Sequence, residues 1–119
     1  MRTRMLAVTV DCREAEALAA FWKEALGYPE TKRWKDSHGL TYVELRSQDE
    51  PSLLFQPVPE EKSGKNRLHL DLAPTELEQR EEVARLVSLG AKIVDDPEDD
   101  DWVVMTDPEG NEFCVLPRR

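Results

Sequence analysis

Two helical patterns, placed alike in the two halves of the chain, constrain the possible fold most strongly. From Glu14 to Leu26 apolar residues recur at helical spacing, at Leu18, Phe21, Trp22, Ala25 and Leu26. From Thr75 to Leu89 a second pattern begins with Thr75 as the expected N-cap and has an inner face of Val83, Leu86 and Val87. Both patterns end in Leu-Gly, and the two glycines stand about half the chain length apart. The sequence therefore indicates two copies of one structural unit.

Short extended segments surround the two helices in the same order, one before each helix and three after it. In the first half they are Met5 to Val10, Thr31 to Trp34, Leu40 to Leu45 and Ser52 to Pro57. In the second half they are Leu68 to Leu72, Ala91 to Val94, Trp102 to Thr106 and Glu112 to Leu116. We therefore expect an α+β fold, a single domain of two βαβββ modules at residues 1–58 and 67–119, with a linker at 59–66. The modules would form a cup-shaped, curved mixed sheet, with one helix per module on its outer face.

The first strand of the second module carries the candidate catalytic residues. Side chains alternate along a strand, so Leu68, Leu70 and Leu72 are expected to pack under the helix, and His69 and Asp71 to face the cup. An imidazole beside a carboxylate can act as a general base whose tautomer the carboxylate selects. The alternative is a hydrogen-bonded structural pair without chemistry.

Five further residues are candidates for contact with a ligand. Trp34 and Trp102 lie in strands near loops, where an aromatic ring either closes a sheet edge or lines a pocket. Gln56 stands near the end of one strand, while Glu112 and Cys114 share a face of the last strand. Cys114 also suits the role of a small apolar filler, because no neighbouring basic residue in the sequence would lower the pKa of its thiol.

Charge and composition exclude several classes of partner. The net charge is −9 and no basic stripe is present, which argues against a nucleic-acid partner. No apolar run approaches the roughly 18 residues of a membrane span. The chain has two cysteines, which favours a reduced, cytoplasmic protein over a disulfide scaffold. The acidic run at residues 95–101 lacks the spacing of a calcium loop and is expected to be a solvated connection.

Three segments together resemble a known superfamily over essentially the whole chain. They are Asp11-Cys12 with the helix from Leu18 to Tyr28, the strand from Asn66 to Leu72, and the hairpin from Trp102 to Cys114. Their order and spacing are similar to the vicinal oxygen chelate superfamily, in its glyoxalase-like and bleomycin-resistance-like branch. The resemblance implies paired βαβββ modules and a homodimer. In metal-dependent members it also implies a divalent ion held by His, Gln or Glu from the first and last strands of each module, acting as a Lewis acid.

This chain matches the implied metal ligands only in part. His69 stands where the superfamily places a metal-binding His, but the equivalent position of the first strand falls near Ala7, and the last-strand Glu corresponds to Cys114. A metal site needs about three convergent protein ligands. We therefore assign no metal ligand, while a divalent metal held by another combination, with Gln56, His69, Glu112 and Cys114, remains possible.

Three functions follow from the sequence and the resemblance. The first is a glyoxalase-like protein that binds a small organic molecule in the cup, with acid–base chemistry through His69. The second is a metal-dependent lyase, isomerase or dioxygenase of the vicinal oxygen chelate type. The third is a non-catalytic domain that sequesters a drug or serves an interaction.

Overall fold

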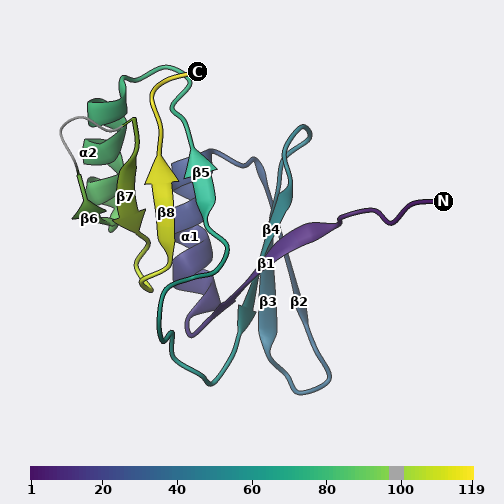
Figure 1. Cartoon of the computed structure of the whole chain (residues 1–119). Coiled ribbons are helices and arrows are strands. Elements are labelled where there is room, and N and C mark those ends of the chain that lie inside the picture. Colours follow the sequence, from purple (N-terminus) through teal and green to yellow (C-terminus); the bar gives the residue numbers. More distant parts are fainter. Residues whose placement is uncertain (97–100) are drawn as a thin grey trace. The chain divides into compact units, whose positions relative to one another are not determined.

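The computed structural model describes residues 1–96 and 101–119, and the chain divides into two compact units, residues 1–61 and 62–119 (Figure 1). Each unit contains one helix and one four-stranded mixed sheet with the same strand order. The predicted α+β fold of two βαβββ modules is thereby confirmed. Residues 62–66, which were expected to be part of a linker, belong to the second unit. Of the acidic run, residues 97–100 lie outside the described residues.

The first unit folds around the apolar stripe of its helix. Its elements are β1 (Ala7–Cys12), α1 (Ala15–Leu26), β2 (Glu30–Lys35), β3 (Thr41–Arg46) and β4 (Ser52–Pro57). The strand order is β1-β4-β3-β2, with β1 parallel to β4 and the other pairs antiparallel. Helix α1 contacts β3 and β4, and its buried Leu18, Phe21 and Trp22 form the core with apolar residues of those strands. The helix ends at Gly27, whose φ of 68° is a left-handed conformation that glycine adopts without steric cost.

The second unit repeats this plan. Its elements are β5 (Leu70–Leu72), α2 (Gln79–Leu89), β6 (Lys92–Asp95), β7 (Val103–Thr106) and β8 (Glu112–Val115). The strand order is β5-β8-β7-β6, and again only the first pair, β5 with β8, is parallel. One face of the sheet is buried in the core with α2, through Val103, Met105, Phe113 and Val115. The alternate side chains of β7 and β8 therefore point to the opposite face.

Three predicted boundaries are wrong for local reasons. Helix α2 begins at Gln79, not near Thr75, because Glu78 and Glu81 form a reciprocal capping box that satisfies the first backbone N–H groups. Strand β5 begins at Leu70, and Leu68 is 88% exposed instead of packed under the helix, because pairing with β8 covers only Leu70 to Leu72. Strand β1 begins at Ala7, after an exposed Met5.

Neither helix within the described ranges is long enough to cross a membrane. The longer one, α1, has 12 residues, whereas a spanning helix needs about 20 apolar residues.

Candidate functional site

The face of the second sheet opposite the buried core lines a pocket of about 380 Å³. Its apolar wall comes from Trp102, which precedes β7, from Val104 within β7 and from Leu116 after β8. Its polar side chains are those of Lys65, His69, Asp71, Glu112 and Cys114. The whole lining therefore comes from the second unit, and it combines a hydrophobic surface with titratable groups, which is typical of small-molecule sites.

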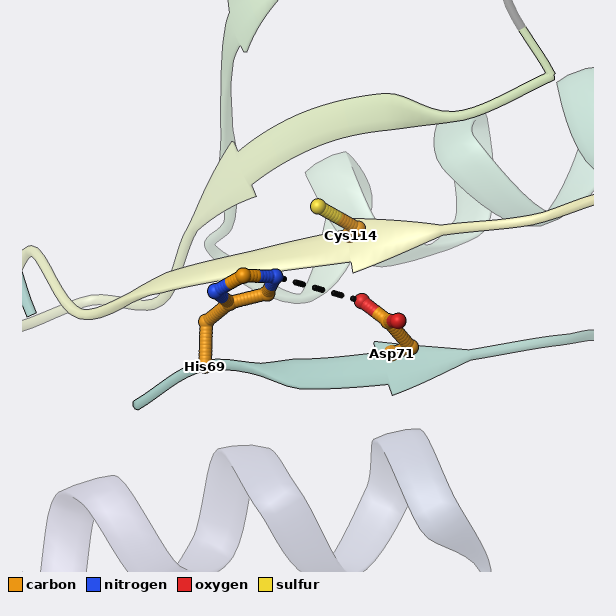
Figure 2. Close-up of side chains that lie close together, drawn as sticks. All are labelled: His69, Asp71 and Cys114. Atoms are coloured by element: carbon orange, nitrogen blue, oxygen red, sulfur yellow. Dashed lines mark ion pairs between the residues drawn. The ribbon is translucent and has the colours of Figure 1, made fainter. Parts of the chain in front are cut away.

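Strand register places the central residues of this pocket side by side. Asp71 of β5 pairs with Cys114 of β8, and Cys114 pairs in turn with Val104 of β7, so the three side chains form a row on one face. His69 lies one residue before β5 and shares the face of Asp71 (Figure 2). The alternation predicted from the sequence therefore does bring the imidazole and the carboxylate to the pocket face.

The geometry of His69 and Asp71 favours one tautomer of the imidazole. Nε2 of His69 lies 3.5 Å from Oδ1 of Asp71, and both side chains are partly open to solvent, with exposures of 41% and 57%. The other ring nitrogen, Nδ1, points away from Asp71 (Figure 2). A carboxylate facing Nε2 favours the tautomer that carries its proton there. Nδ1 is then the acceptor that a ligand can reach.

Cys114 completes the cluster with a protonated thiol. Burial raises the pKa of its thiol above the usual value of 9.0, and the charge of Asp71 and a hydrogen bond to that carboxylate raise it further, while the Lys65 ammonium opposes them. The thiol therefore stays protonated at neutral pH. Because the thiolate is the nucleophilic form of cysteine, Cys114 is poorly suited to nucleophilic catalysis.

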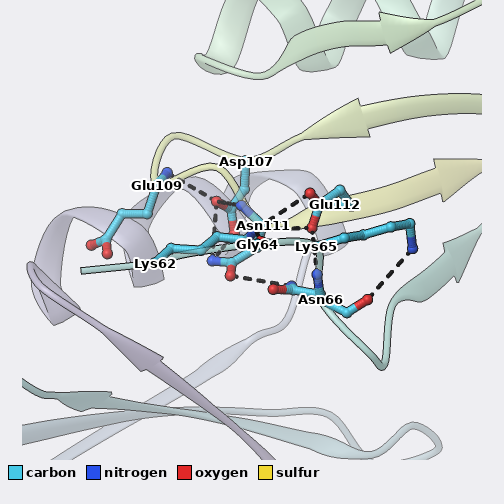
Figure 3. Close-up of polar contacts among 8 residues, drawn as sticks. All are labelled: Lys62, Gly64, Lys65, Asn66, Asp107, Glu109, Asn111 and Glu112. Atoms are coloured by element: carbon cyan, nitrogen blue, oxygen red, sulfur yellow. Dashed lines mark hydrogen bonds and ion pairs between the residues drawn. The ribbon is translucent and has the colours of Figure 1, made fainter. Parts of the chain in front are cut away.

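Glu112 fastens the segment 62–66 onto the β7–β8 hairpin (Figure 3). The backbone N–H of Asn66 donates to Glu112 Oε1 at 3.0 Å, and Lys62 Nζ lies 3.3 Å from the carboxylate. The side chain of Asn66 also donates to Asn111 Oδ1 at 3.2 Å, and Asn111 Nδ2 donates to the buried carboxylate of Asp107 at 3.0 Å. The Asn66 N–H lowers the pKa of Glu112 most, and the backbone N–H of Glu112 and then Lys62 lower it further, so this carboxylate is ionised and already engaged.

The predicted ligand-binding residues fall in both units. Trp102, Glu112 and Cys114 line the pocket together with His69 and Asp71. Trp34 and Gln56 lie on the sheet of the first unit, where the Trp34 ring stacks at a tilt with Tyr42 at a centroid distance of 6.0 Å.

Sequence reasoning missed three lining residues. Val104 and Leu116 share the alternation that identified Cys114 and were accessible to the same argument. Lys65 falls in the predicted linker, and no periodicity of the sequence indicates that it lines the pocket. Its position there depends on the side-chain contacts that hold the segment 62–66.

The donor set of the pocket fits a divalent transition-metal ion. One donor atom each of His69, Asp71 and Cys114 lies within 4.8 Å of the others. An imidazole nitrogen, a carboxylate oxygen and a sulfur are all zinc-type ligands, and three such ligands leave a coordination position open for a substrate. The combination differs from the one expected from the sequence, because Asp71 takes part, whereas Glu112 is engaged by Asn66 and Lys62.

Comparison with known proteins agrees with this architecture. The model of the glyoxalase-like domain family matches residues 7–116, so the chain belongs to that family and, with it, to the vicinal oxygen chelate superfamily. No curated protein gives a significant match to the sequence.

Solved structures share the fold at low sequence identity. A variant of the fosfomycin resistance protein FosX from Listeria monocytogenes, complexed with Mn(II) and 1S,2S-dihydroxypropylphosphonic acid, gives a TM-score of 0.77 at 13% identity over 98% of this chain and 93% of that one. The trypanothione-dependent glyoxalase I of Leishmania major gives 0.70 at 18% identity over 98% and 87%. A glyoxalase/bleomycin resistance protein/dioxygenase family enzyme from Burkholderia phytofirmans gives 0.65 at 19% identity over 92% and 94%. At these identities the likeness shows the fold alone.

Proposed function

We propose that the second unit binds a small organic molecule in its pocket and that His69 exchanges a proton with it. The observation that carries this proposal is the convergence of His69, Asp71 and Cys114 beside an apolar wall in one pocket. A structural pair needs no such wall, whereas a ligand site combines apolar surface with a few placed polar groups.

Each residue of the cluster has a distinct task in this proposal. Nδ1 of His69 accepts a proton from a hydroxyl or from a carbon next to a carbonyl group, and later returns it. The resulting imidazolium is stabilised by the carboxylate of Asp71, whose oxygen lies 3.5 Å from Nε2. Cys114 keeps its thiol protonated beside that carboxylate. A positioned general base of this kind contributes roughly 10²–10⁴-fold to a rate.

Proton abstraction from carbon can be measured without knowledge of the natural substrate. We would incubate the protein with hydroxyacetone in D₂O containing EDTA and follow deuterium incorporation at the carbon next to the carbonyl by NMR. We expect exchange above the buffer rate, loss of that excess in His69→Gln and a marked decrease in Asp71→Asn, because the first variant removes the base and the second its partner. Equal exchange in the wild type and both variants would remove the catalytic role of His69.

A divalent-metal enzyme is the second candidate, and the three donors within 4.8 Å favour it. His69, Asp71 and Cys114 would hold the ion, and a bound ion would supply Lewis-acid polarisation of a ligand oxygen. Co(II) titration tests the site directly, since a coordinated thiolate gives a charge-transfer absorption band. We expect the band in the wild type and in the control Cys12→Ser, which removes the buried thiol of the first unit, and its absence in Cys114→Ser. No band in the wild type would exclude Cys114 as a ligand.

The remaining inferences from the family resemblance stay predictions. A drug-sequestering or interaction domain would bind ligands at the pocket without any exchange in D₂O. The predicted homodimer is tested by sedimentation at micromolar concentration, where a monomer alone would contradict it. The lyase activity and the cytoplasmic location also remain predictions.

A further inference from the structure

We propose that Lys65 binds the anionic group of the ligand, so that the pocket takes small organic acids with an apolar body. This inference rests on the proposed small-molecule function and names the class of ligand. It begins from the charges that face the pocket: the ammonium of Lys65, the carboxylates of Asp71 and Glu112, and the imidazole of His69.

Both carboxylates already have partners within the second unit. Glu112 accepts the N–H of Asn66 at 3.0 Å and lies 3.3 Å from Lys62 Nζ, which compensates its charge. Asp71 has Nε2 of His69 as a neighbour at 3.5 Å. Glu112 is therefore paired with a cation, and Asp71 is engaged by the imidazole.

Lys65 lacks such compensation. Among the described residues no carboxylate lies within ion-pair distance of its ammonium. The ammonium donates to the backbone carbonyl of Asn66 at 3.4 Å, which is long for such a bond. A cation that lines a pocket and has no carboxylate partner is the group best placed to receive an anion.

The backbone that carries Lys65 is held in place on both sides. Lys62 reaches Glu112 from one side of the segment, and Asn66 is tied to Glu112 and Asn111 from the other (Figure 3). Binding therefore has to order only the side chain of Lys65, which limits the entropic cost. The ammonium also opposes the rise in the pKa of the Cys114 thiol, which agrees with a position close to the floor of the pocket.

The apolar wall determines the other half of the ligand. Trp102, Val104 and Leu116 offer a ring and two aliphatic side chains, against which a flat or branched hydrocarbon group can pack. A carboxylate and a phosphonate are both anions that a lysine binds as a point charge. An organic acid with one of these groups at Lys65 and its hydrocarbon part against Trp102 uses both features of the pocket.

Matched probes test the charge requirement separately from binding itself. We would titrate ¹⁵N-labelled protein with benzoate, with its neutral isostere benzamide and with phenylphosphonate, and follow the indole N–H of Trp102 and the amides of His69 and Cys114 by NMR. Lys65→Met removes the ammonium from an exposed side chain. Lys23→Met, on α1 of the first unit, removes the same charge from a residue that is not among those lining the pocket.

We expect benzoate to bind more tightly than benzamide, and Lys65→Met to weaken benzoate about fivefold while leaving benzamide and the Lys23→Met control unchanged. A preference for phenylphosphonate over benzoate identifies a phosphorus anion as the favoured group, and the reverse identifies a carboxylate. Equal binding of benzoate and benzamide, or unchanged benzoate affinity in Lys65→Met, would overturn the role of Lys65 and leave the small-molecule function standing. If none of the three probes shifts the pocket signals, both proposals fail.

Discussion

Replacing Glu112 with glutamine tests whether its charge holds the segment 62–66 against β8. Glutamine keeps an acceptor for the Asn66 N–H but loses the negative charge that strengthens this bond and pairs with Lys62. Hydrogen bonds to charged groups contribute about 1.5–3 kcal/mol, and those between neutral groups about 0.5–1.5 kcal/mol. The ion pair is partly screened, since the two side chains are 23% and 19% exposed, and contributes at most about 1 kcal/mol. We expect a total loss of about 1–2 kcal/mol in the free energy of unfolding at neutral pH.

The effect of Glu112→Gln has a definite pH dependence. The folded state lowers the pKa of Glu112 below its ordinary value of 4.5. Its contribution to stability is therefore fully present above that value and disappears as the pH falls through the lower pKa of the folded protein. The difference between the wild type and Glu112→Gln should accordingly be largest near neutral pH and vanish in acid.

Urea unfolding near neutral pH and again near the acid limit of folding measures this difference. Hydrogen exchange of the Asn66 amide adds a local measurement, because it detects detachment of the segment without global unfolding. The exchange rate should rise about fivefold for each 1 kcal/mol by which detachment becomes easier. The matched control is Glu76→Gln, an exposed glutamate of the same unit, for which we expect no change. Equal stability and equal Asn66 exchange in the wild type and Glu112→Gln near neutral pH, or a deficit that persists unchanged in acid, would refute the reasoning.

Three further predictions concern the second unit. Phe113→Ala removes a ring that is 1% exposed, and it should lower the free energy of unfolding, measured by urea titration, by about 3–5 kcal/mol. A loss under about 1 kcal/mol would contradict the place of Phe113 in the core. The pKa of the Cys114 thiol is raised by burial and by Asp71, so the thiol should react with iodoacetamide at pH 8 more slowly than a free cysteine. Asp71→Asn should speed this reaction, and peptide mass spectrometry measures both rates. An unchanged rate in the variant would show that Asp71 does not raise the thiol pKa. Gly110→Ala should cost about 1–2 kcal/mol, since φ is 89° there, and a neutral effect on the melting temperature would show that the turn relaxes freely.

The periodicity of apolar residues was sufficient to predict the helices and strands, because each element buries one face and the spacing of its apolar residues follows that face. The stripe of Leu18, Phe21 and Trp22 predicted α1 to within one residue of its observed start. The start of α2 was misplaced although its signal is present in the sequence, since Glu78 and Glu81 have the spacing of a capping box. Thr75 belongs to the residue types commonest at N-caps, but the capping box of Glu78 and Glu81 determines where the helix begins.

The same alternation gave a mixed result for β5. It correctly placed His69 and Asp71 on the face of the pocket. It wrongly placed Leu68 in the core, because alternation has meaning only where a strand is paired, and β5 pairs with β8 for three residues alone. Where the pairing stops, the side chain is no longer held against the helix layer.

The amino-acid sequence by itself determined the two βαβββ units and the face on which an imidazole and a carboxylate stand, since both follow from local periodicity along one chain. Only the tertiary structure decided that Cys114 lies beside Asp71, that Glu112 is already engaged, and that Lys65 belongs to the pocket. The physical reason is that these properties depend on strand register and on hydrogen bonds between residues distant in sequence. Those contacts determine both how the charges pair and how much space is left for a ligand. Residue spacing along the chain does not predict them.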